Sequence, residues 1–280
     1  MKLFKRDRAK KRLKDLLQGE EPPTFPKSAM KLMRLLRDPE TEMSVIGEAL
    51  EWDPRLVLRV LKTVNSAAYG TARKIDNISH AVSMMGRTQL EQIVLGVVVK
   101  DNLPRASTPG FDAQRFWQTA FFRATIGRAI ANRLHPSLQA QSFTGGLLQD
   151  MAVPLLAHAR PDEYGAILRE WHGSGEAQLH KLEKEVLGFG HDEVGAHLSV
   201  EWELPETLST IIGNHHSHDL GDDELPPAMR LVSIHRETER DLGLEALLEE
   251  ARNYSLDPDW IMGAVETSDA QATELAKSLL

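Results

Sequence analysis

Apolar residues recur every three or four positions along most of this chain, which is the period of an α-helix. The pattern is clear after Asp53-Pro54, where Leu56, Val60 and Val64 are spaced four residues apart. Asp53 is a suitable N-cap residue, and a proline fits the first turn of a helix because its missing N–H would have no partner there. No segment alternates apolar and polar residues as a half-buried strand would. The sequence therefore predicts an all-α fold.

Prolines and glycines divide the chain into segments of different character. The predicted segments are a basic amphipathic leader (residues 1–21), an N-terminal helical lobe (22–103), a second helical lobe (110–220) and C-terminal helices (221–280). The boundary between the two lobes is predicted from Asp101 to Gly110, because this stretch holds Pro104 and Pro109 and no helical period. A chain of 280 residues is long enough to bury a substantial core.

The chain has no cysteine, which excludes disulfide bonds, thiol catalysis and metal sites with cysteine ligands. Its eleven histidines leave sites of histidine and carboxylate open. The most apolar run, Ile93–Val99, is far shorter than the roughly 20 residues that a membrane helix needs. No apolar segment typical of a signal peptide follows the basic N-terminus. Together these features predict a cytoplasmic protein.

Charge is distributed unevenly along the chain. The net charge is −8, yet residues 1–17 contain eight lysines and arginines against Asp7 and Asp15. Leucines between these cations make the segment amphipathic, so it could contact an anionic membrane surface or an acidic partner. A solvated, partly frayed helix explains the same pattern without any partner. Because the rest of the chain is strongly acidic, general nucleic-acid binding is not expected.

Short motifs in both predicted lobes resemble those of a known family. In the first lobe they are residues 23–26 (PTFP), 65–69 (NSAAY) and 78–86 (ISHAVSMMG). In the second lobe they are residues 145–150 (GGLLQD), 190–196 (GHDEVGA), 202–205 (WELP) and His215-His216. This ordered set resembles the HDOD domain, a family of bacterial regulators related to the HD superfamily of metal-dependent phosphohydrolases. The resemblance implies a two-lobed helical fold and a role in signal transduction.

The resemblance also indicates where a catalytic metal site would lie and what it lacks. HD hydrolases hold metal ions with histidine and aspartate side chains, and the metal activates a water molecule. The paired His-Asp of that superfamily reads Gln149-Asp150 here, and Thr119 stands where a histidine is expected shortly after Trp117. An amide or a hydroxyl is a poor substitute for an imidazole on a transition metal.

Four residues remain at positions that resemble metal ligands of the related HD-GYP hydrolases. They are Asp150, His191, His215 and His216. The sequence therefore predicts no catalytic residue and no cofactor, although one weakly held metal ion is possible. Thr119 and Gln149 would mark a degenerate pocket. A simpler interpretation of His191-Asp192 is that Asp192 caps the following helix.

A basic pattern on the helix after Asp53 has two interpretations. Arg55, Arg59 and Lys62 are spaced so that they share one face of this helix. The face could dock an acidic partner. It could equally be an ordinary solvated surface.

Three functional hypotheses follow from the sequence. The first is a non-catalytic regulatory module that acts through contacts with other signalling proteins or by binding a small ligand. The second is an HD-type phosphohydrolase acting on a nucleotide or cyclic dinucleotide. The third is a regulator associated with a membrane or nucleic acid and governed by residues 1–17.

Overall fold

The computed structural model describes residues 2–65, 74–174, 178–217, 221, 224–234 and 240–279. Every regular element in these ranges is a helix, which confirms the predicted all-α class. None of the described helices is sufficiently long and apolar to cross a lipid bilayer.

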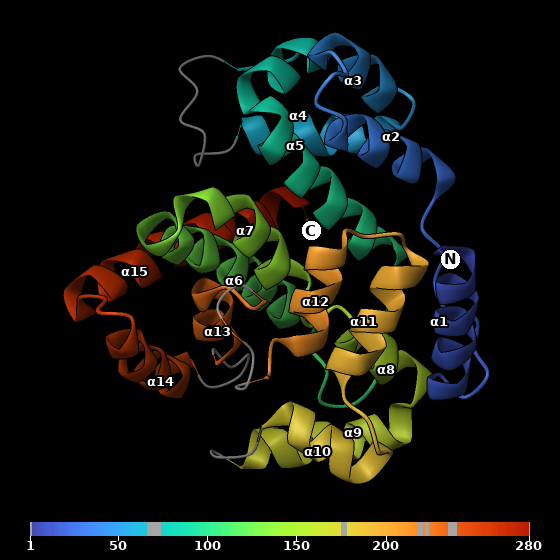
Figure 1. Ribbon diagram of the computed structural model, residues 1–280, viewed down its shortest axis with the longest axis vertical. Coiled ribbons are helices and arrows are strands. Elements are labelled where there is room, and N and C mark those ends of the chain that lie inside the picture. Colours follow the sequence, from blue (N-terminus) through green and yellow to red (C-terminus); the bar gives the residue numbers. More distant parts are fainter. Residues whose placement is uncertain are drawn as a thin grey trace.

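Fifteen α-helices and one short 3₁₀-helix are described. The first are α1 (Lys2–Leu16), α2 (Lys27–Arg37), α3 (Met43–Leu50), α4 (Pro54–Val64) and α5 (Ile78–Asn102). The middle of the chain forms α6 (Ala113–Leu134), the 3₁₀-helix η2 (Pro136–Leu138), α7 (Gln139–Leu148), α8 (Val153–Ala159), α9 (Pro161–Gly173), α10 (Leu179–Leu187), α11 (His191–Glu201) and α12 (Glu206–Asn214). The last are α13 (Pro227–Ser233), α14 (Arg240–Asn253) and α15 (Pro258–Leu279). Helices α2–α4 lie at one end of the molecule, and α9 and α10 lie at the other (Figure 1).

Local capping explains where α4 begins and how its end is held. Its first residue is Pro54, and the Asp53 carboxylate accepts a hydrogen bond from the Arg55 backbone N–H at 3.0 Å, as predicted. At the other end the Asn65 side chain donates to the Leu61 carbonyl and exchanges two hydrogen bonds with the Ile75 backbone, each at 2.7 Å. These bonds join α4 to the segment that leads into α5.

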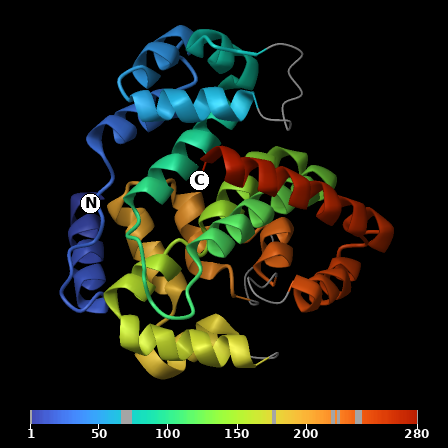
Figure 2. The same ribbon diagram turned by 180° about the vertical axis from the view of Figure 1, so that it is seen from behind.

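Helix α5 connects the N-terminal helices to the centre of the molecule. Gly86 interrupts it with φ 71° and ψ 167°, a conformation that favours glycine. The next residue, Arg87, donates hydrogen bonds to carbonyls at the end of α2 and beyond it, including those of Leu36 and Asp38 at 3.1 and 2.7 Å. After the kink the apolar residues of α5 are buried, and the helix packs against α7. Figure 2 shows α15 lying across α6 on the far side.

The basic leader forms α1 and packs along α11 (Figure 1). Its apolar face is buried, with Leu13 and Leu17 having no exposed surface. Arg12 reaches across to Glu193 on α11 with two hydrogen bonds of 3.0 and 2.7 Å. The apolar face of α1 is buried against the rest of the protein, so only the outward, polar face remains available to a partner.

The two central helices, α6 and α7, approach each other closely at Gly146. A Cβ atom at this position would lie 2.6 Å from the Arg123 carbonyl oxygen and 3.0 Å from the Ala124 nitrogen. Only a residue without a side chain fits that spacing. The glycine at 146 therefore allows α6 and α7 to pack closely here.

Candidate metal site

Asp150, His191, His215 and His216 converge on one place in the second half of the molecule. Each offers a ligand atom, and these atoms all lie within 4.8 Å of one another. Asp150 follows the end of α7, His191 is the first residue of α11, and the two adjacent histidines follow α12. The cluster therefore joins three segments that are distant in sequence, and it comprises all four residues expected from the resemblance.

His191 is held in place by a carboxylate from the preceding helix. Glu183 on α10 is fully buried, and its Oε2 accepts both the His191 backbone N–H and the His191 ring Nδ1–H at 2.7 Å. Its other oxygen accepts a hydrogen bond from the Tyr164 hydroxyl. Glu183 therefore supplies the partner for a backbone group at the start of α11 and fixes the orientation of the imidazole.

The prediction that Asp192 caps α11 is wrong. The N-cap residue is Gly190, and Asp192 lies inside the first turn, where its carboxylate accepts from Lys184 Nζ at 3.1 Å. The physical reason is that Glu183 satisfies the N–H of His191 from outside the helix. No local capping side chain is needed for that group.

Hydrogen bonding fixes which ring nitrogens face the centre of the cluster. The His215 Nδ1 donates to the Ile212 carbonyl at 2.8 Å, because a carbonyl can only accept. In neutral His191 and His215, Nδ1 thus carries the proton and Nε2 presents a lone pair. These two lone-pair nitrogens are only 3.2 Å apart, and His216 Nε2 is 3.0 Å from His191 Nε2. A hydrogen bond from His216 Nε2–H to the His191 Nε2 lone pair, or a metal ion among the rings, would account for nitrogens this close together.

Burial keeps two imidazoles of the cluster, His215 and His216, in the neutral form. Burial lowers the pKa of His215 to about 3, with a further decrease from His191. Burial also lowers the pKa of His216 well below its usual value and that of the neighbouring His180, which stacks on His216, to about 4. These three rings are neutral at neutral pH, so His215 and His216 have the lone pairs that ligands require.

The distances in the cluster fit the coordination shell of one ion. Asp150 Oδ1 lies 3.4 Å from His191 Nε2 and 3.2 Å from His215 Nε2. Ligand atoms bound at about 2.1 Å to one ion are about 3.0 Å apart in an octahedral shell and about 3.4 Å apart in a tetrahedral one. Asp150 Oδ1 is also buried and accepts no hydrogen bond within the described residues. Three imidazoles and one carboxylate suit zinc, iron or manganese.

The other oxygen of Asp150 is bound by an arginine. Arg123 on α6 donates from Nη1 to Asp150 Oδ2, and the two side chains are 9% and 14% exposed. The short α6–α7 distance at Gly146 brings these residues together. A positive charge is thus fixed on the oxygen that could otherwise have bound a second metal ion.

The two degenerate positions predicted from the sequence are both buried. Thr119 lies one turn before Arg123 on the same face of α6, and it is 8% exposed. Gln149 is fully buried at the end of α7, and neither atom of its amide has a hydrogen-bond partner within the described residues. Neither side chain supplies the nitrogen donor that a second transition-metal ion would require.

Sequence reasoning missed Arg123 and Glu183. A signal for Arg123 was available, since a single charge stands in an otherwise apolar stretch from Ala120 to Ala124. Such a charge is rarely buried without a partner. Glu183 lies among several charged residues of α10, so nothing in the local pattern distinguishes it.

Comparison with known proteins identifies the family. The sequence profile of the HDOD domain matches residues 23–218. The chain belongs to the HDOD domain family. This match confirms the predicted resemblance and covers both groups of motifs on which it was based.

Solved structures of similar fold include one that is described as an HDOD domain protein. An HDOD domain protein of unknown function from Geobacter sulfurreducens has a TM-score of 0.73 and 20% identity, covering 96% of this chain and 97% of its own. A candidate phosphohydrolase from Shewanella amazonensis has a TM-score of 0.78 and 23% identity over 96% and 98% of the two chains. A candidate signal transduction protein from Marinobacter aquaeolei has a TM-score of 0.77 and 19% identity, with 99% of this HDOD chain covered. At these identities the likeness shows the fold.

A longer relative is found by sequence. An uncharacterized protein from Treponema pallidum is 27% identical over 232 residues, which is 81% of this HDOD chain. The chain spans only 44% of that protein's length and 65% of the Marinobacter chain.

Proposed function

We propose that this HDOD chain is a non-hydrolytic regulatory module of signal transduction. The observation that carries the proposal is the ion pair between Arg123 and Asp150, in which a guanidinium binds the carboxylate oxygen facing away from the histidines. The family assignment and the Marinobacter neighbour, described as a candidate signal transduction protein, agree with this role.

The histidine cluster has too few ligands for the two metal ions of a typical phosphohydrolase centre. Two-metal hydrolases clamp the attacking and leaving oxygens between ions about 3.5–4 Å apart. One carboxylate commonly has to serve both ions, and here Asp150 Oδ2 is already bound to a fixed cation. With Thr119 and Gln149 in place of imidazoles, a second ion would have too few nitrogen ligands. We therefore assign no catalytic residue.

The cluster retains the ligands for one ion. Asp150, His191, His215 and His216 would hold it, and Glu183 would orient His191 through the ring Nδ1–H. Bound there, a divalent ion would act as a Lewis acid. In a regulatory module, the bound ion would hold three segments of the chain together, because its ligands come from the end of α7, from α11 and from the turn after α12.

The outputs of the module are proposed to be contacts with other signalling proteins. The outward face of α1 is a second contact surface, suited to an acidic partner or an anionic membrane, because Arg8, Lys10 and Lys11 are exposed there. A cysteine-free chain fits a reducing compartment, and we propose the cytoplasm.

The competing function is hydrolysis of a nucleotide or cyclic dinucleotide. The converging histidines favour it, and the Shewanella neighbour is described as a candidate phosphohydrolase. A reaction at this cluster would have to run with a single ion and with Arg123 as the second positive charge.

A hydrolysis screen separates the two functions. The purified chain is incubated with nucleotides and cyclic dinucleotides in the presence of Mn²⁺ or Fe²⁺, alongside His191→Ala. We expect no turnover above that of the variant, because no second ion can assemble. Turnover that requires both the metal and His191 would overturn the proposed function.

A further inference from the structure

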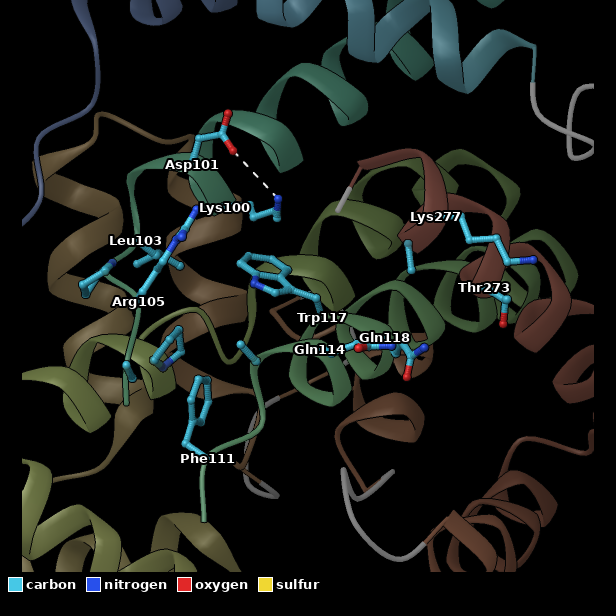
Figure 3. Close-up of a pocket in the computed structure, with 15 residues that line it drawn as sticks. Lys100, Asp101, Leu103, Arg105, Phe111, Gln114, Trp117, Gln118, Thr273 and Lys277 are labelled. Atoms are coloured by element: carbon cyan, nitrogen blue, oxygen red, sulfur yellow. Dashed lines mark ion pairs between the residues drawn. The ribbon is translucent and has the colours of Figure 1, made fainter. Parts of the chain in front are cut away.

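A large cavity lies apart from the histidine cluster. Its volume is about 710 Å³, within the range of roughly 300–1,000 Å³ typical of small-molecule sites. It is formed by the end of α5, the loop that leads to α6, the first turns of α6 and the last turns of α15 (Figure 3). None of the four candidate metal ligands lines it. The cavity is therefore a separate site.

The cavity is positively charged, although the protein as a whole is acidic. Three cationic side chains line it, Lys100, Arg105 and Lys277, and the only carboxylate among the lining residues is that of Asp101. Lys277 Nζ is paired with Glu274 Oε1 at 2.9 Å, so the excess of positive charge comes mainly from Lys100 and Arg105. Asp101 Oδ1 is 3.9 Å from Lys100 Nζ, which is a weak contact. In a chain of net charge −8, a local excess of positive charge favours an anionic ligand.

The electrostatic environment of Lys100 shows how crowded these cations are. Burial lowers the pKa of Lys100, and the positive charges of Arg59, Arg105 and Lys62 lower it further, whereas Asp101 opposes the change. An anion bound among these groups would relieve their mutual repulsion.

The basic face of α4 borders this cavity. Lys62 Nζ donates to the Lys277 carbonyl at 2.6 Å, so it holds the end of α15 against α4. Arg59 is close enough to Lys100 to lower its pKa, whereas Arg55 is paired with Asp53 at 3.0 Å. Two of the three cations on that face thus add to the positive potential around the cavity.

The remaining lining is suited to a flat aromatic group. Figure 3 shows the Trp117 indole in the middle of the lining, with Lys100 and Arg105 to one side and Lys277 to the other. Phe111 contributes a second aromatic ring. Gln114 and Gln118, one turn apart on α6, also line the cavity. Aromatic rings stack on bases, and amide groups can donate to or accept from base edges.

From this combination we infer that the cavity binds a nucleotide, with its phosphate at Lys100 and Arg105 and its base against Trp117. The inference goes beyond the proposed function, because it concerns binding at a site that lies outside the histidine cluster. Bound ligand would bridge α5, α6 and α15, and α6 also carries Arg123.

Binding to the full chain is tested by isothermal titration calorimetry with purine mononucleotides and cyclic dinucleotides, and with pyrophosphate as an anion lacking a base. Two variants are compared with the unaltered chain. Arg105→Glu reverses an exposed charge that lines the cavity from the loop before α6. Arg115→Glu reverses an exposed charge in the first turn of α6 that does not line it.

We expect at least one nucleotide to bind, with its affinity reduced about tenfold or more by Arg105→Glu and less than about threefold by Arg115→Glu. Pyrophosphate should bind more weakly than the nucleotide. The inference fails if no nucleotide binds, if both variants have the same effect, or if pyrophosphate binds equally well. None of these results bears on hydrolysis, so failure here is distinct from failure of the proposed function.

Discussion

Gly146→Ala is expected to lower the free energy of unfolding by about 3 kcal/mol, the upper end of the usual penalty for overpacking. The new Cβ would lie 2.6 Å from the Arg123 carbonyl oxygen and 2.8 Å from the Arg123 carbonyl carbon. Both are backbone atoms of a buried helix and cannot move as a flexible side chain could. The change should therefore push α6 away from α7 and disturb the Arg123–Asp150 pair. Urea unfolding followed by circular dichroism measures the loss.

The matched control is Gly263→Ala in the second turn of α15. Nothing lies within 4 Å of a Cβ at that position, and alanine is favoured over glycine in a helix by up to about 1 kcal/mol. We expect this variant to be as stable as the original chain or more stable. Equal stability of the two variants would contradict the close α6–α7 contact.

Asp150→Ala is expected to destabilise the metal-free protein by about 3 kcal/mol or more. Arg123 is 9% exposed in its side chain, and the substitution removes the carboxylate that binds its guanidinium. Removing one member of a buried ion pair typically costs about 3–5 kcal/mol, because the other charge stays buried. The loss of stability distinguishes this site from an active site in which the carboxylate serves only catalysis, because removing such a carboxylate would not lower the free energy of unfolding. The same urea experiment measures it.

Two further variants make the Asp150 prediction specific. Asp101→Ala removes a carboxylate whose contact with Lys100 is long and more exposed, so its effect should stay below about 1 kcal/mol. In Asp150→Ala/Arg123→Met no buried guanidinium remains, and part of the lost stability should return. If the double variant loses as much free energy of unfolding as the two single variants added together, Asp150 and Arg123 do not stabilise each other.

Much of the fold could be predicted because helical signals are local. The start of α4 at Asp53-Pro54 follows from the conformational preferences of two residues, and it is observed. The helical period of the apolar residues is likewise local, and every regular element in the described ranges is a helix. Packing of the leader on α11 was not predicted, because the period of α1 shows an apolar face but not what covers it.

The candidate site was predicted only in part, for a related reason. Family motifs indicated the four converging residues, and the structure brings them together. The groups that set their chemistry come from elsewhere in the chain: Arg123 is 27 residues from Asp150, and Glu183 is eight residues from His191. No periodic pattern encodes which polar side chain will meet another across a helix interface. The Asp192 error has this origin, because a local capping rule was applied where a distant carboxylate takes its place.

The most direct test of the proposed role is the number of metal ions at the histidine cluster. Crystals grown from protein loaded with Mn²⁺ or Fe²⁺, with anomalous diffraction to locate each ion, would provide it. We predict at most one ion, bound by Asp150 Oδ1 and the histidines, with Arg123 still on Oδ2. Two ions bridged by Asp150, with Arg123 displaced, would contradict the account and make the protein a candidate hydrolase.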